Sequence, residues 1–220
     1  MLWRGDFHNA RQLLQAMARR CEQKKSSKKN KQEAIPTDLK QAFNLHRVAQ
    51  AQRARVLGML LIEVGENYQI PLKRAPDFSQ ACLEAYGEFT SPFVISLREL
   101  QGLVGAHEWR KKGAYVAALD ANIHPHFGVF SPVRGEYVDL VANALLPQPC
   151  KLAFDIGTGS GVLSCLLAKR GIPQVIGTDL DARALACARE NVQRLGFTNL
   201  VQIESANLFP GTSTKADLIV

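Results

Sequence analysis

The chain has 220 residues, of which 46% are hydrophobic, and carries a formal net charge of +7. It shows no signal peptide and no apolar run long enough to cross a membrane, which excludes a membrane-spanning protein. Its five scattered cysteines form no Cys-x-x-Cys pair, so a disulfide scaffold is also excluded. We therefore expect reduced thiols and a cytoplasmic location.

Residues 1–114 are predicted to form a mainly helical N-terminal domain. Helical spacing of apolar residues appears over 7–18, 37–55, 77–86 and 96–111. Asp6 is a candidate N-cap of the first helix, and Ser96 with Glu99 forms a capping box at the start of the last. The apolar run 59–62 is compatible with either a helix or a strand.

The positive charge is concentrated near the N-terminus. Residues 1–60 contain thirteen Lys and Arg against four Asp and Glu, a balance of +9, whereas the remainder has a balance of −2. Clustered basic residues are typical of proteins that bind a polyanion, so we expect RNA, such as ribosomal RNA, as the partner. The polar segment 24–36 is predicted to be a flexible linker, and the competing interpretation is a solvated basic loop.

A glycine-rich segment over Asp155–Gly161 has the features of a cofactor site. It follows a short apolar run and precedes a helical pattern, which is the strand, turn and helix of a nucleotide-type site. A carboxylate at the end of the strand would repel a pyrophosphate and attract an ammonium group. The glycine spacing departs from Gly-x-Gly-x-x-Gly, and no Gly-Lys-Ser/Thr follows, so S-adenosylmethionine remains as the ligand. The candidate binding residues in this loop are Asp155, Gly157, Thr158, Gly159 and Gly161.

The following elements extend the same site. Val175–Asp179 is a predicted strand whose terminal Asp179 can accept hydrogen bonds from both ribose hydroxyls of an adenosine. Asp181 is expected to cap the next helix rather than to contact the ligand. After a third strand, the side chain of Asn207 can accept a hydrogen bond from the adenine amino group. A fourth strand begins at Asp217.

These ordered motifs over 150–220 resemble the first half of a class I S-adenosylmethionine-dependent methyltransferase domain. The resemblance implies an α/β fold with a Rossmann-like sheet, of which 115–220 would form the amino-terminal part. Phe127–Pro132 is similar to a segment of the small-domain methyltransferases, which include ribosomal-RNA guanine-N2 and release-factor glutamine enzymes. In that group the segment closes one side of the cofactor pocket, which would place Phe130 against the ligand. The alternative is that Phe130 is a core residue and Ser131 only caps a helix over 134–146.

In the group that the chain resembles, the fourth strand leads into an Asn-Pro-Pro-aromatic motif that holds a planar nitrogen. The sequence ends at Val220, so we expect a truncated and inactive portion of the enzyme, and we assign no catalytic residue. The expected function is methylation of a planar nitrogen of RNA. The alternatives are methylation of a protein glutamine and a non-catalytic binding fragment. His124 and His126 could face a metal, but a local packing or substrate-edge role is favoured, and no metal is expected.

Overall fold

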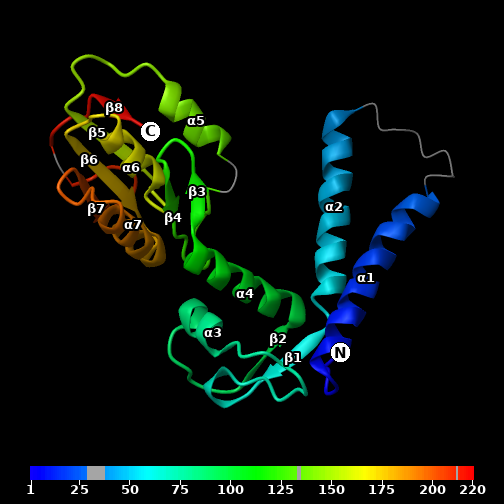
Figure 1. The fold of residues 1–220 in the computed structure, drawn as a ribbon. Coiled ribbons are helices and arrows are strands. Elements are labelled where there is room, and N and C mark those ends of the chain that lie inside the picture. Colours follow the sequence, from blue (N-terminus) through cyan, green and yellow to red (C-terminus); the bar gives the residue numbers. More distant parts are fainter. Residues whose placement is uncertain (29–37, 133–134, 212) are drawn as a thin grey trace. The chain divides into compact units, whose positions relative to one another are not determined.

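The computed structural model describes residues 1–28, 38–132, 135–211 and 213–220, without the side chains of 23–28. The chain divides into two compact units, Met1–Gly105 and Ala106–Val220 (Figure 1). The predicted linker over 24–36 is wrong at its start, because the first helix runs to Lys28. The rest of that linker lies outside the described residues. Within the described ranges, no helix is long and apolar enough to cross a membrane.

The first unit combines helices with one small antiparallel sheet. Its elements are α1 (Phe7–Lys28), α2 (Leu39–Leu57), β1 (Leu61–Val64), the 3-10 turn η1 (Glu66–Tyr68), α3 (Ser79–Tyr86), β2 (Phe93–Ser96) and the start of α4 (Leu97–Lys112). The sequence leaves open whether the run at 59–62 is helical or extended. Its last two residues belong to strand β1, because β1 pairs with β2 in the register Ile62↔Ile95.

The helix starts in this unit follow their polar caps. The Asp6 carboxylate accepts the backbone N–H of His8 at 2.8 Å, which confirms the predicted cap of α1. Helix α2 begins later than predicted, because Asp38 is its cap and accepts the N–H of Lys40. Ser96 accepts the backbone N–H of Glu99 at 3.1 Å, as the capping box predicts.

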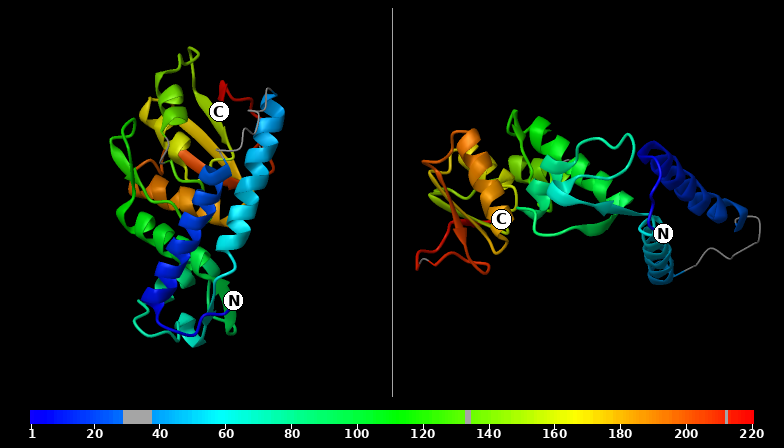
Figure 2. Two further views of the ribbon diagram at one scale, coloured as in Figure 1. Left: turned by 90° about the vertical axis from the view of Figure 1, so that its right-hand side faces the viewer. Right: turned by 90° about the horizontal axis from the view of Figure 1, so that it is seen from below.

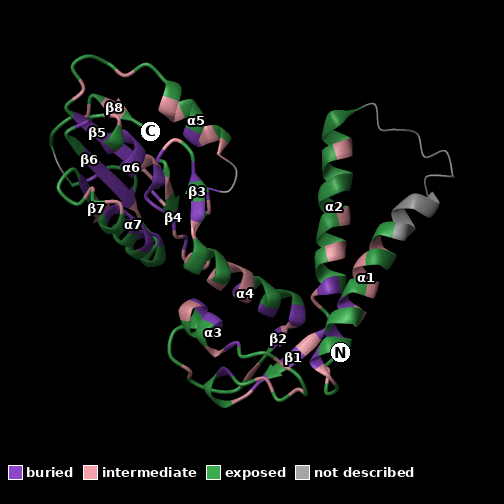
Figure 3. Ribbon diagram, in the orientation of Figure 1, coloured by how far each residue is buried: buried purple, intermediate pink, exposed green. Residues whose placement is uncertain are grey.

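Helices α1 and α2 lie next to each other in the first unit (Figure 2), and Arg53 forms an ion pair with Glu22 at 2.6 Å between them. The buried face of α1 includes Phe7, Ala10 and Leu14. Helix α2, by contrast, is exposed along most of its length (Figure 3).

The second unit contains a parallel sheet with the predicted Rossmann-like arrangement. Its elements are the end of α4, β3 (Ala114–Val116), β4 (Ala121–Ile123), α5 (Glu136–Asn143), β5 (Leu152–Ile156), α6 (Val162–Lys169), β6 (Gln174–Asp179), α7 (Ala182–Arg194), β7 (Val201–Ser205) and β8 (Leu218–Ile219). The strand order is β7-β6-β5-β8, and β5 pairs in parallel with both β6 and β8. The expected α/β fold class is confirmed for this unit.

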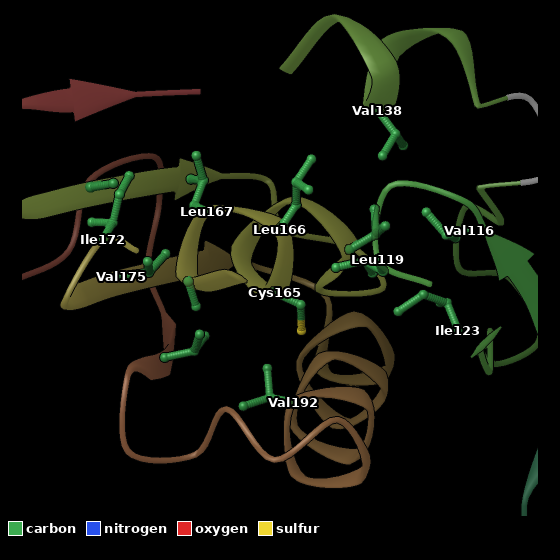
Figure 4. Packing of buried hydrophobic residues seen from close by; sticks show 14 residues of the cluster. Val116, Leu119, Ile123, Val138, Cys165, Leu166, Leu167, Ile172, Val175 and Val192 are labelled. Carbon is green, nitrogen blue, oxygen red and sulfur yellow. The ribbon is translucent and has the colours of Figure 1, made fainter. Parts of the chain in front are cut away.

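The main core of the second unit lies on one face of this sheet. Strand residues such as Ala153 and Val175 pack there with Leu166 of α6 and Val192 of α7. Residues of the β3–β4 hairpin and of α5 join the same cluster, as Figure 4 shows for Leu119 and Val138. Leu152, Phe154 and Ile176 form a separate small cluster, consistent with the alternation of strand side chains between two faces.

The predicted helix after Pro132 is shorter than expected. Helix α5 begins at Glu136 with Gly135 as its N-cap residue and without a side-chain cap. Ser131 is therefore not its cap, and its hydroxyl oxygen is buried without a hydrogen-bond partner among the described residues. Residue Arg134, where the sequence predicts the helix to begin, lies outside the described residues.

Candidate functional site

The candidate cofactor residues gather at the carboxyl ends of three neighbouring parallel strands. The Gly-rich loop follows β5, Asp179 ends β6, and Asn207 comes two residues after β7. The chain continues from β5 to β6 on one side, and β8 joins β5 on the other. This reversal of strand order is the point at which open α/β sheets bind their ligands.

Three glycines give the loop its path. Gly157, Gly159 and Gly161 have φ values of 75°, 55° and 79°, in the left-handed region that residues with a Cβ seldom adopt. The carbonyl of Thr178 accepts the N–H groups of both Gly157 and Thr158 at 2.8 Å. These two donors therefore fasten the loop to β6 and are not free to bind a ligand.

The outer side of the loop is open. An added Cβ would meet no protein atom within 4 Å at Gly157, and only the Gly157 carbonyl at 3.8 Å at Gly159. At Gly161 a Cβ would lie 3.1 Å from the Cα of Ala188, so this glycine allows the loop to pack on α7. The first two glycines thus leave space for a ligand, while the third serves packing within the protein.

Asp155 is almost fully buried, with a relative exposure of 2%. Its Oδ2 accepts the hydroxyls of Thr158 at 2.7 Å and Ser164 at 2.6 Å, and also the backbone N–H of Ser164 at 2.9 Å. Burial raises the pKa of this carboxyl above its ordinary value, although the three hydrogen bonds oppose that shift. In this structure Asp155 therefore ties the Gly-rich loop to the start of α6.

Asp179 faces the same loop from the end of β6. Its Oδ2 accepts the backbone N–H of Gly159 at 3.1 Å, and its Oδ1 accepts that of Asp181 at 2.9 Å. Each carboxylate oxygen can accept a further hydrogen bond. Asp181 caps α7 by accepting the N–H of Arg183 at 2.8 Å, which confirms its predicted structural role.

The remaining two candidates are exposed. Phe130 has a relative exposure of 67%, so the core interpretation is wrong for its side chain, and its ring centroid lies 6.0 Å from that of Tyr137. The negative charge of Asp155 contributes to a raised pKa of Tyr137, after desolvation by burial. Tyr137 itself packs against the main core of the second unit. Asn207 is exposed beside the sheet, where the N–H of Ala206 donates to the carbonyl of Asp179.

Four residues that support this site are not among those predicted from the sequence. Ser164 and Thr178 supply contacts described above, and Asn191 of α7 donates to the carbonyl of Ser160 at 3.0 Å. At Gly177 an added Cβ would lie 2.7 Å from the Ser164 hydroxyl oxygen. Ser164 and Asn191 are polar residues on otherwise apolar helix faces. This position could have identified them, since buried polar groups require hydrogen-bond partners.

The histidine pair serves local packing. The Nδ1 atom of His124 lies 2.7 Å from the carbonyl oxygen of Arg110, and His126 Nε2 lies 2.8 Å from the carboxylate of Glu190. Across the described part of the chain, no group of three or more His, Cys, Asp or Glu residues could hold a metal ion. Cys165 and Cys187 are buried, and burial raises the pKa of Cys165 to about 12.

Comparison with known proteins shows which proteins the second unit is similar to. The family profile of ribosomal protein L11 methyltransferases (PrmA) matches residues 141–220. The L11 methyltransferase of Alkaliphilus oremlandii is 46% identical over 67 residues, which cover 30% of this chain and 21% of that protein. The enzyme of Lactobacillus gasseri is 36% identical over 94 residues, covering 43% and 29%. The matches thus span about a fifth to a third of the length of these relatives.

Among solved structures, the N-terminal domain of human METTL16 in complex with S-adenosylhomocysteine aligns with 62% of this chain and 58% of its own. The sequence identity is 16% and the TM-score is 0.32, which is too low to support an inference.

The expected RNA partner is wrong. The relatives that this chain matches are named for a ribosomal protein as substrate and not for RNA. The basic residues at 1–60 misled the prediction, because net charge reports a tendency to bind polyanions and does not identify a methyl acceptor. The comparisons agree with the S-adenosylmethionine cofactor that the motifs predict, and over residues 141–220 they support the resemblance to class I S-adenosylmethionine-dependent methyltransferases.

Proposed function

We propose that the second unit binds S-adenosylmethionine at the carboxyl end of its parallel sheet and that the protein methylates a protein substrate. The observation that carries the proposal is the open side of the Gly-rich loop, at Gly157 and Gly159, beside the carboxylate of Asp179. A ligand lying on these glycines would reach Asp179 with its ribose.

Each candidate residue receives a distinct role in this proposal. Asp155 acts mainly by holding the loop, and its buried charge also favours the ammonium group of the cofactor nearby. Thr158 and Gly161 maintain the loop through their contacts with Asp155 and α7.

The adenosine end of the cofactor would meet the later elements of the site. Asp179 has unused acceptor capacity for the two ribose hydroxyls. The exposed Asn207 would accept a hydrogen bond from the adenine amino group, and the exposed ring of Phe130 would cover one side of the ligand. Methyl transfer itself needs chiefly the alignment of acceptor, methyl group and sulfur, because the sulfonium is already activated.

The protein substrate follows from the relatives, which are ribosomal protein L11 methyltransferases. By this similarity, L11 is the first substrate to test. A glutamine amide nitrogen is the acceptor that the small-domain resemblance implies. We further propose that residues 115–220 form the amino-terminal part of the methyltransferase domain and that residues 1–114 form an accessory domain.

The test is methyl transfer from tritiated S-adenosylmethionine by the longest natural form of the protein. Purified ribosomal proteins and protein-free ribosomal RNA are offered separately. We expect label in a protein of the size of L11, and peptide mass spectrometry then identifies the acceptor side chain. Label confined to RNA, or no label while the cofactor still binds, would contradict the proposed substrate.

A further inference from the structure

The first unit contains a pocket that is lined by aromatic and acidic residues, although residues 1–60 of the same unit are rich in Lys and Arg. It has a volume of about 420 Å³ and lies at α3, β2, the loop between them and the first turns of α4. Six of its lining residues carry the argument: Tyr68, Tyr86, Glu88, Phe89, Phe93 and Glu99. Among the residues that the structure describes, no Lys, Arg or His lines this pocket.

The four aromatic rings meet at steep angles. The Tyr68 ring is inclined by 87° to Phe89 and by 78° to Phe93, at centroid distances of 5.3 and 6.3 Å. Tyr86 is inclined by 86° to Phe93 at 5.7 Å. Edge-to-face contacts at these distances pack the rings against one another and fix their orientation, so a cation would approach the ring faces that border the pocket.

The rings are held in place by hydrogen bonds. The Tyr68 hydroxyl donates to the carbonyl of Gly87 at 2.8 Å, and the Tyr86 hydroxyl donates to the carboxylate of Glu99 at 2.9 Å. Tyr68 is 5% exposed, whereas Tyr86 is 41% exposed. The pocket thus has a fixed inner ring and an accessible outer ring, and little ordering is needed when a ligand enters.

The charge of this part of the chain suits a cation. Residues 61–105 contain six Asp and Glu against three Lys and Arg, whereas residues 1–60 have four against thirteen. Glu88 and Glu99 both line the pocket. A carboxylate beside aromatic faces attracts a cation by charge and by the ring quadrupole, and it repels phosphate.

We propose that this pocket binds the alkylammonium end of a lysine side chain on a partner protein. The methylene stem would lie against the aromatic rings, and the ammonium group would lie near Glu99 and Glu88. The identification of the partner as a methylation substrate rests on the proposed function, but the binding of an alkylammonium group does not.

The test uses the whole chain and three small probes of equal stem length, followed by NMR titration without cofactor. The probes are N-acetyl-lysine amide, its trimethylammonium derivative and the uncharged N-acetyl-norleucine amide. We expect both cations to bind. Norleucine amide should bind about tenfold more weakly, because it has no ammonium group to contact the carboxylates. The ratio of the two cations shows whether unmodified or methylated lysine is preferred.

Two variants locate the site. Glu99→Gln should weaken binding of both cations about tenfold. The matched control is Glu66→Gln, which changes an exposed carboxylate of the same unit outside the pocket lining and should leave binding unchanged. Equal binding of norleucine amide and the cations, no binding of either cation, or equal effects of the two variants would overturn the proposal. None of these outcomes bears on the cofactor site, because no cofactor is present.

Discussion

Gly177 and Asp179 belong to the same strand and have different roles in the site. Gly177 lies in the interior of β6, where the side chains of Ser164, Thr158 and Ile203 leave no room for a Cβ. Two residues later, Asp179 reaches the exposed edge and contacts the Gly-rich loop. The first residue therefore determines packing, and the second is available for a ligand.

Replacing Gly177 by alanine should destabilise the protein. The new Cβ would lie 2.7 Å from the Ser164 hydroxyl oxygen and 2.9 Å from Thr158 Oγ1, which is overpacking that costs about 1–3 kcal/mol. Gly211→Ala is the control, because a Cβ there meets no atom within 4 Å. Urea unfolding measures both, and equal midpoints for the two variants would show that the site is less tightly packed than described.

Replacing Asp179 by alanine should weaken cofactor binding. The change removes a charged acceptor beside the open side of the loop, so we expect a loss of about 1.5–3 kcal/mol. Asp181→Ala removes a nearby carboxylate that serves as a helix cap and should leave the affinity almost unchanged. Calorimetry with S-adenosylhomocysteine compares the two variants. A larger loss for Asp181→Ala would reverse the roles assigned to them.

At the scale of elements, local sequence signals predicted where helices start more reliably than they predicted contacts between distant segments. Asp6 and Ser96 cap their helices as predicted, because an N-cap bonds to groups only two or three residues away. Ser131 has the same local signal, yet the helix starts at Glu136. The strand at Leu61 also depends on a distant partner, Ser96, which no local pattern contains.

The edge strand β8 is held in place partly by hydrogen bonds of the Asp217 side chain. Oδ2 of Asp217 accepts the backbone N–H groups of Lys151 and Leu152 at 2.7 and 3.0 Å. These bonds hold the pKa of Asp217 below its ordinary value. Because the folded pKa is depressed, the stabilisation is present above the unfolded pKa of about 3.9 and is lost as the pH falls through the folded value.

Asp217→Ala should therefore lower the thermal midpoint at neutral pH and flatten its decline below about pH 4. Asp217→Asn keeps an acceptor oxygen but cannot titrate, so it should retain more stability at neutral pH and show the same flattening. Thermal unfolding between pH 2 and pH 7 measures both variants. An unchanged pH profile in both would show that the two hydrogen bonds do not hold β8.

At the scale of the whole molecule, the sequence predicted the parallel sheet and the place of the Gly-rich loop, and its prediction of an RNA partner was wrong. The loop was predictable because strand, glycines and helix are contiguous over 152–169. The hydrogen bonds that hold the loop from inside the protein could not be predicted. Asp155 accepts a hydrogen bond from Ser164, nine residues away, and the carbonyl of Thr178 fastens the loop from another strand. The partner was mispredicted because charge on one segment does not define the reacting substrate.

The central claim is that a ligand occupies the open side of the Gly-rich loop, and a matched pair of glycine variants tests it most directly. Gly157 and Gly171 have φ values of 75° and 92°, and at neither would a Cβ meet a protein atom within 4 Å. Alanine should therefore strain the backbone by about 1–2 kcal/mol at either position.

The measurement is calorimetric titration of S-adenosylhomocysteine into the wild type and both variants. We predict one binding site in the wild type and in Gly171→Ala, and binding at least tenfold weaker in Gly157→Ala. Equal affinities in the two variants, or no binding to a folded wild-type chain, would contradict the account.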